Sequence, residues 1–123
     1  MEISEKGKKG EDFACEYLRK LGYEIIDRNW HSRYGEIDII ARKDEYIVFV
    51  EVKTRQYNAM ISGAMAVNYR KQKKIVLTSA LYLLDVEEEL QPRYDVIEVQ
   101  LSGDNICGIQ HYEGAFNTEG ILY

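Results

Sequence analysis

Hydrophobic residues recur at helical spacing near the start of the chain. The positions are Phe13, Ala14, Tyr17, Leu18 and Leu21. Intervals of three and four residues place such side chains on one face of an amphipathic helix. The pattern therefore predicts a helix over residues 5–21, which Gly22 ends.

The pattern then changes to short runs rich in β-branched and aromatic residues, which are typical of strands. Strands are predicted over residues 23–29, 36–42, 46–54, 94–101 and 106–112, the last of them at an edge of the sheet. Polar segments separate these runs, with a loop at 31–35 and a turn at 102–105. These polar segments are predicted to form the short connections between successive strands.

Between the third and fourth strands the chain reads as a loop and then a helix. The Gly, Ser, Asn and Met content of residues 57–66 predicts a loop. A second helix is predicted over residues 67–88, and Pro92 prevents it from continuing. The order of elements is helix, three strands, helix and two strands, which indicates an α/β domain.

The composition supports a single domain. The chain has 123 residues, of which 46% are hydrophobic, enough for one core. We therefore expect one domain over residues 1–123, with its core at about 4–101 and a final strand and tail at 102–123. The longest apolar stretch, residues 75–84, is about half as long as a membrane-spanning helix, so no membrane association is expected.

The start of the chain and the cysteines indicate a cytoplasmic protein. The first residues contain no hydrophobic signal region. Cys15 and Cys107 are too few and too far apart to suggest a disulfide framework or a metal-binding motif, so both are read as free thiols.

Charge is distributed unevenly along the chain. The formal net charge is −5, but residues 1–84 carry +3 and residues 85–123 carry −8. A polyanion would therefore meet the first two-thirds of the chain, and the acidic final third argues against broad binding to duplex nucleic acid. The segment 70–74 carries four positive charges, which could equally be the solvated start of a helix.

Two neighbouring strands carry charged residues among apolar ones. If residues 44–45 form a two-residue turn, residues paired across the hairpin have numbers that sum to 89. Asp38 then faces Glu51, and Glu36 faces Lys53. Side chains two apart share a face of a sheet, so all four would emerge on one side, with opposed positions about 4.5–5.5 Å apart. A slip of one residue would send the charges of one strand to the opposite face.

The opposed carboxylates of Asp38 and Glu51 would repel each other unless a cation lies between them. A divalent ion such as Mg²⁺ is held by one or two carboxylates together with water and substrate phosphate oxygens. An alternative needs no metal: Glu36 could neutralise Lys53, and Asp38 could accept hydrogen bonds from the backbone or from Arg33. The apolar flanks favour the metal site, because unpaired charge is costly inside strands this hydrophobic.

Five segments, in this order along the chain, resemble one known family. They are Gly10-Glu11-Asp12-Phe13-Ala14, Gly35-Glu36-Ile37-Asp38-Ile39-Ile40-Ala41, Phe49-Val50-Glu51-Val52-Lys53-Thr54-Arg55, Arg70-Lys71-Gln72-Lys73-Lys74 and Arg93-Tyr94-Asp95-Val96. Together they resemble the YraN-like family of small, largely uncharacterised bacterial proteins over residues 7–100. Tyr94 stands where the family more commonly has Phe, which is a mild departure.

That family is similar in pattern to the restriction-endonuclease-like superfamily, which includes archaeal Holliday junction resolvases. The resemblance implies an α/β restriction-endonuclease-like fold, a central mixed sheet of four to five strands flanked by helices. It also implies Asp38 and Glu51 as metal ligands, Lys53 beside them, and Glu11 as a further acidic group. An alternative for Glu11 is an acid at a helix N-terminus that complements the helix dipole.

These positions could together hydrolyse a phosphodiester. Asp38 and Glu51 would hold Mg²⁺ or Mn²⁺, and Lys53 would orient the attacking water or stabilise charge on the phosphate. Glu36 is expected either to orient Lys53 or to lie outside the residues that contact the metal. Candidate nucleic-acid-binding residues are Arg55, Arg70, Lys71, Gln72 and Lys74, of which Gln72 and Lys74 are expected to face phosphate, and Lys71 and Lys73 solvent.

The sequence leaves three functions open. The first is a metal-dependent nuclease acting on DNA, with branched structures as one substrate class; a resolvase would need two active sites, which implies a homodimer. The second is a nucleic-acid-binding module that keeps the fold without turnover. The third is a protein-interaction role for the acidic final third. His31 is read as a surface histidine, and His111 carries no functional signal.

Overall fold

The computed structural model describes residues 3–58 and 67–122. Five strands form one sheet in the order β1-β2-β3-β4-β5. The elements are α1 (Ile3–Lys20), β1 (Glu24–His31), β2 (Glu36–Lys43), β3 (Tyr46–Gln56), α2 (Tyr69–Leu83), β4 (Gln91–Ser102) and β5 (Asn105–Phe116). All neighbouring strands are antiparallel except β3 and β4, which run parallel. The predicted α/β class, element order and mixed sheet flanked by helices are confirmed.

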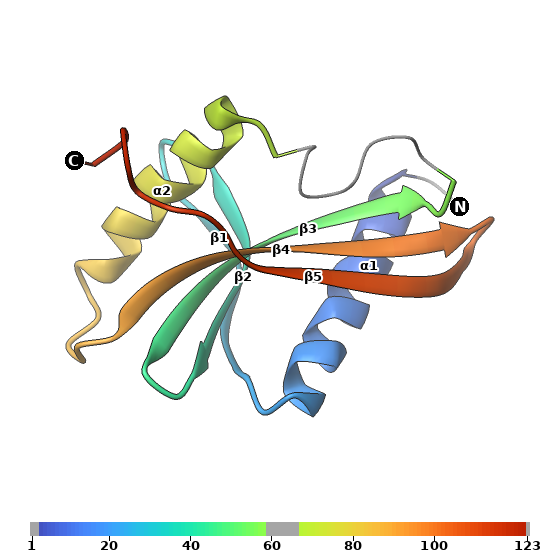
Figure 1. Cartoon of the computed structure of the whole chain (residues 1–123), viewed down its shortest axis with the longest axis horizontal. Coiled ribbons are helices and arrows are strands. Elements are labelled where there is room, and N and C mark those ends of the chain that lie inside the picture. The colour runs from blue at the N-terminus through green and yellow to red at the C-terminus, as the bar shows by residue number, and fades with distance from the viewer. Residues whose placement is uncertain (1–2, 59–66, 123) are drawn as a thin grey trace.

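The two helices lie on opposite faces of the sheet (Figure 1). A core cluster on one face joins α1 to the sheet through Ala14, Cys15 and Leu18. A second cluster on the other face joins α2 to the sheet through Ile75 and Val76. Helix α2 lies in the connection between the parallel strands β3 and β4, because parallel neighbours need a long crossover, which is usually helical.

The face that α1 buries agrees only in part with the expected one. Phe13 and Leu21, predicted to belong to the apolar face, are 39% and 44% exposed. The contact with the sheet is made by Ala14 and Leu18, as predicted, together with Cys15. Gly10 shows how near the helix lies, because a Cβ at this position would be 2.0 Å from Thr54 Oγ1. A close approach of this kind selects small side chains over the large aromatic one.

The second helix is shorter than predicted at both ends. Asn68 caps its start by accepting the Lys71 N–H at 3.0 Å, so the helix begins after residue 68 rather than at 67. It ends at Leu83, before the acidic residues 85 and 87–89. Negative charge at a helix C-terminus is unfavourable for the helix dipole, which explains the early end. Of the predicted loop at 57–66, residues 59–66 lie outside the described residues.

The strands are longer than predicted, and the turns fall where they were expected. The pairing of Lys43 with Tyr46 confirms the two-residue turn, in which Asp44 has φ 55°. Pro92 lies inside β4, near its beginning, where a missing N–H is tolerated. Strand β5 extends to Phe116 and lies at the edge of the sheet, as predicted.

Two further expectations concern the cysteines and the membrane. Cys15 is buried and Cys107 is exposed, and both are free thiols as predicted. No helix in the described part of the chain is long and apolar enough to cross a membrane.

Candidate functional site

Strand β2 changes its pattern of burial at Asp38. Ile37 packs in the cluster on the α2 side, whereas Ile39 packs in the cluster on the α1 side. In a regular strand, residues two apart point to the same face. The alternation is therefore interrupted at Asp38, and the expectation that Glu36 and Asp38 share a face with Glu51 by simple alternation is wrong.

Strand β1 has an unusual backbone conformation at the facing position. In its pairing with β2, Arg28 pairs with Ile39 and Trp30 pairs with Ile37. Asn29 of β1 and Asp38 of β2 therefore lie opposite each other, between these two pairs. Asn29 has φ 50°, in the left-handed region. Two adjacent strands thus depart from regular geometry at the same level of the sheet.

The pairing between β2 and β3 also ends at this level. It follows the predicted register, in which partners sum to 89, from Lys43–Tyr46 as far as Ile39–Val50. Beyond this point the Asp38 side chain, through Oδ2, accepts the backbone N–H of Val52 at 2.8 Å. The side chain takes the place of a backbone acceptor. Asp38 therefore accepts a hydrogen bond from the backbone, as the alternative without a metal predicted. Arg33 instead donates to the hydroxyl of Tyr34.

The environment of Asp38 favours its protonated form. Burial, followed by the nearby charge of Glu51, raises its pKa from 3.8 to about 8. The hydrogen bond from Val52 lowers the pKa, while the charges of Glu11 and Glu36 raise it further. Acids from α1, β2 and β3 therefore act on one buried carboxyl group. A nearby positive charge would favour the ionised form of this carboxyl group and lower its pKa.

Glu51 lies between two lysines. Its side chain is only 4% exposed, and its Oε1 lies 3.3 Å from Lys53 Nζ and 3.4 Å from Lys71 Nζ. Lys53 comes from the same strand and Lys71 from the first turn of α2. Lys71, expected to face solvent, is 44% exposed but also pairs with Glu51, because the Asn68 cap starts the helix where Lys71 points toward β3. Glu36 pairs with His31 at 3.6 Å, and that histidine is exposed, as predicted.

Glu11 lies well inside α1. The helix begins at Ile3 and its first turn contains Glu5. The reading of Glu11 as an acid at a helix N-terminus is therefore wrong, because the dipole acts within the first turn. Its Oε1 accepts a hydrogen bond from Asn29 Nδ2 at 3.0 Å and lies 3.6 Å from the Arg28 guanidinium.

The residues present fit a loosely held hard cation. Within residues 3–58 and 67–122, no group of three or more His, Cys, Asp and Glu side chains is arranged to bind a metal. Asp38 and Glu51 supply carboxylate oxygens from adjacent strands, the donor type that Mg²⁺ and Mn²⁺ prefer. A divalent ion held by these two residues would need water and phosphate oxygens to complete its coordination.

The other candidate contacts to nucleic acid divide into two groups. Arg70, Lys73 and Lys74 are exposed on the first turns of α2. Gln72 uses its amide to donate to the Val67 carbonyl, and Arg55 lies 3.8 Å from the carboxylate of Glu98. The Nε atom of Arg55 is buried without a hydrogen-bond partner.

Three polar residues of this region escaped the sequence-based prediction. Glu98 is a buried carboxylate in β4 and pairs in register with Lys53. Its position within the run Val96-Ile97-Glu98-Val99 is the same signal that singled out Glu51. Arg28 and Asn29 carry no such signal, because they lie on an exposed edge strand.

Comparison with known proteins decides the family. The model of Uncharacterised protein family UPF0102 matches residues 10–99. The chain belongs to this family. A UPF0102 protein of Alkaliphilus oremlandii is 48% identical over 113 residues, which cover 89% of this chain and 96% of that protein. A UPF0102 protein of Syntrophotalea carbinolica is 42% identical over 93% of each chain, and one of Rhodococcus jostii is 42% identical over 89% of this chain and 94% of its own length.

The UPF0102 match confirms the YraN-like resemblance and spans every acid of the candidate site. It runs from Gly10, next to Glu11, to Val99, next to Glu98. The last strand, β5, lies beyond it. Two residues of β5 nevertheless complete a network that starts within the UPF0102 region.

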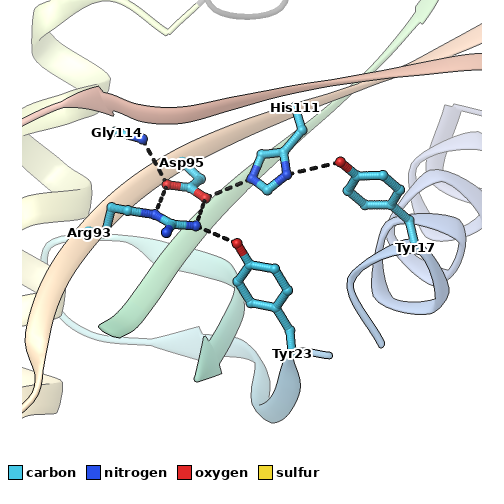
Figure 2. A network of polar contacts seen from close by, with 6 residues as sticks. All are labelled: Tyr17, Tyr23, Arg93, Asp95, His111 and Gly114. Atoms are coloured by element: carbon cyan, nitrogen blue, oxygen red, sulfur yellow. Dashed lines mark hydrogen bonds and ion pairs between the residues drawn. The ribbon is translucent and has the colours of Figure 1, made fainter. Parts of the chain in front are cut away.

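This network is centred on Asp95 (Figure 2). Its fully buried carboxylate accepts hydrogen bonds from Arg93 at 2.8 and 2.9 Å and from the Gly114 N–H at 3.0 Å, and it lies 2.7 Å from His111 Nε2. Burial alone would raise the pKa of Asp95, but these partners hold it below 3.8. The network continues from His111 to Tyr17 of α1 and from Arg93 to Tyr23. In this UPF0102 chain, Asp95, held by Arg93, thus connects β4 to β5 and, through His111, to α1.

Proposed function

We propose that this UPF0102 protein is a cytoplasmic, metal-dependent nuclease that hydrolyses phosphodiester bonds in DNA. The observation that carries the proposal is the approach of Asp38 and Glu51 where β2 and β3 separate. The charge of Glu51 raises the pKa of Asp38. Two mutually repelling carboxylates, with two lysines at the edge of the pair, are suited to bind Mg²⁺ or Mn²⁺ and a phosphate together.

The roles of the residues follow from their positions. A divalent ion bound by Asp38 and Glu51 would supply Lewis-acid polarisation of a phosphoryl oxygen and a lower pKa for water at the site. Lys53 lies on the same strand as Glu51, where its ammonium group can stabilise charge that develops on the phosphate. Lys71 reaches the same carboxylate from α2 and can move to a phosphate oxygen when a metal replaces it.

The exposed cations of α2 support nucleic acid as the substrate. These cations are Arg70, Lys73 and Lys74. They lie in the first turns of α2, next to the Asn68 cap that directs Lys71 to Glu51. A backbone of phosphates that reached the acid site would therefore pass these charges. Branched DNA is a candidate substrate, and resolution of a junction would require a homodimer with two sites.

The decisive experiment is cleavage of end-labelled DNA in the presence of Mn²⁺. The panel contains linear, single-stranded, flapped and four-way-branched substrates, and wild type is compared with Asp38→Asn. Asp44→Asn, an acid in the β2–β3 turn, is the matched control. We expect cleavage by wild type and by the control and none by Asp38→Asn. Equal cleavage by all three proteins, or by none, would reject the nuclease assignment.

A second candidate is a DNA-binding module without turnover. The observation that favours it is the pairing of Glu51 with two lysines, which satisfies this carboxylate without a metal. This module would bind DNA in a salt-sensitive manner, and Asp38→Asn would leave its affinity unchanged. The double variant Arg70→Glu, Lys74→Glu would lose binding. Filter binding or fluorescence anisotropy at two salt concentrations separates this result from cleavage.

A further inference from the structure

We propose that Asn29 is a positioning residue, which holds the Glu11 carboxylate as the third negative charge of the acid site formed by Asp38 and Glu51. This inference rests on the proposed metal site and adds a residue that lies outside it. Asn29 is on the edge strand β1, opposite the Asp38 position. It therefore connects α1, β1 and β2 at one level of the sheet.

The backbone at Asn29 gives the first argument. A non-glycine residue with φ near 50° is uncommon and is costly unless its surroundings require it. The only other example among the described residues is Asp44, which has φ 55° in the tight β2–β3 turn. No turn explains Asn29, which lies inside a strand. The irregularity of β1 in its pairing with β2 falls elsewhere, between Ile25 and Asp27.

The consequence of this conformation is visible in the neighbours of Asn29. Arg28 reaches Glu11 and Asp12 on α1, whereas Trp30 packs on the opposite side of the sheet, in the α2 cluster. In a regular strand Arg28 and Trp30, two residues apart, would share a face, so the left-handed residue between them sends their side chains to opposite faces. Its own side chain is directed to α1, where Nδ2 donates to Glu11 Oε1 at 3.0 Å.

The chemistry of the amide gives the second argument. The Arg28 guanidinium is 2.8 Å from Asp12 but 3.6 Å from Glu11, so it interacts with both carboxylates and more strongly with Asp12. Asn29 holds Glu11 by a neutral donor, which fixes the carboxylate without cancelling its charge. Because Arg28 interacts mainly with Asp12, the Glu11 carboxylate can still attract a cation at Asp38 and Glu51. An ammonium or guanidinium in the place of Asn29 would weaken that attraction.

The surroundings leave this carboxylate accessible. A cavity of about 490 Å³ opens beside it and is lined by Gly7, Lys8, Glu11, Arg28 and Asn29. The side chain of Glu11 is 20% exposed. A group that only tied α1 to β1 would need no cavity at this point. The open space allows water or substrate to approach Glu11.

The test measures Mn²⁺ affinity of the full chain by electron paramagnetic resonance of the free ion. Asn29→Gly removes the side chain, and glycine accepts the left-handed backbone without strain. We expect the Kd for Mn²⁺ to rise about tenfold, the low end of the range for residues that orient a metal site. Asp44→Gly removes the other left-handed side chain and should leave the Kd unchanged.

Glu11→Gln separates positioning from a general structural effect. If Asn29 acts through Glu11, the double variant Asn29→Gly, Glu11→Gln binds Mn²⁺ no more weakly than Glu11→Gln alone. Additive losses would overturn the inference, as would a wild-type Kd for Asn29→Gly. An Asn29→Gly protein that fails to fold, by circular dichroism, would also overturn it, because the role of Asn29 would then be structural.

The readout distinguishes this inference from the nuclease proposal. Mn²⁺ binding that depends on Asn29, without DNA cleavage, would support the positioning role and reject the nuclease. DNA cleavage together with Mn²⁺ binding that does not depend on Asn29 would support the nuclease and reject the positioning role. A wild-type protein that does not bind Mn²⁺ would reject both.

Discussion

His111 Nε2 donates a hydrogen bond to Asp95 across 2.7 Å, in the interior between β4 and β5. The direction is set by the low pKa of Asp95, because an ionised carboxylate can only accept. The imidazole thus carries a proton on Nε2. Its Nδ1 lies 3.1 Å from the Tyr17 hydroxyl of α1. One histidine thus joins the edge strand β5 both to Asp95 of β4 and to the first helix (Figure 2).

Asp95→Asn should therefore destabilise the whole fold. The change preserves size but leaves the Arg93 guanidinium, only 18% exposed, without its counter-charge. Removing one partner from a buried ion pair costs roughly 3 kcal/mol or more. Urea denaturation followed by circular dichroism would measure the loss. Glu16→Gln, at an exposed pair with Arg19, should leave the midpoint unchanged.

The effect of Asp95→Asn should depend on pH. The folded-state pKa of Asp95 lies below 3.8, its ordinary value. The stability that it contributes is present above the unfolded-state pKa and is lost as pH falls through the folded-state pKa. The difference in unfolding free energy between wild type and Asp95→Asn should be constant near neutrality and should shrink in acid below about pH 4. A difference that grew in acid would contradict the network.

Asp38 should show the opposite dependence on pH. Its pKa is about 8 in the folded chain, against 3.8 ordinarily. Between these values the folded state keeps a proton that the unfolded state has released, so rising pH destabilises the protein. Asp38→Asn does not titrate. Its thermal midpoint should therefore exceed that of wild type by more at pH 8 than at pH 5, both measured in chelator. Equal differences at the two pH values would contradict this result.

The hairpin that carries the site could be predicted because its determinants are local. A two-residue turn at 44–45 fixes the register of β2 with β3, and the register holds from Lys43–Tyr46 to Ile39–Val50. Extended by one residue, it places Asp38 opposite Glu51, although the two strands no longer pair there. Alternation of side chains predicted less well, because it assumes regular strands, and Asn29 and Asp38 lie where both strands are irregular.

The parts that sequence could not predict depend on distant partners. The direction of Lys71 depends on where Asn68 starts α2, a matter of one residue at a helix end. The role of His111 depends on Asp95 and Tyr17, which are 16 and 94 residues away along the chain. Neither relation leaves a periodic pattern. Glu98 was predictable by its position in an apolar strand, as Glu51 was.

The close packing of α1 against β3 provides a further prediction. A methyl group at Gly10 would be 2.0 Å from Thr54 Oγ1, so Gly10→Ala should destabilise the protein by about 1–3 kcal/mol. A methyl group at Gly7, three residues earlier in α1, would meet no side chain or neighbouring element within 4 Å among the described residues. Gly7→Ala should stabilise the helix by about 1 kcal/mol.

Rescue identifies the contact at Gly10. In the double variant Gly10→Ala, Thr54→Ala, the hydroxyl is gone, so most of the lost stability should return. Chemical denaturation of the two single variants and the double variant measures the coupling. Strictly additive losses would show that the cost of Gly10→Ala arises elsewhere.

Lys71 should compete with a metal ion for Glu51. Its Nζ lies 3.4 Å from Oε1, the same atom that Lys53 approaches at 3.3 Å. Because a divalent ion must displace at least part of this pairing, Lys71→Ala should lower the Kd for Mn²⁺ about threefold, equivalent to roughly 0.7 kcal/mol. Lys73→Ala removes an exposed lysine from the same turn of α2 and is the matched control. Calorimetric titration of both variants with Mn²⁺ would decide. A Kd that rose in Lys71→Ala would mean that the lysine supports the metal site, whereas equal shifts in both variants would reduce the effect to the overall charge of the helix.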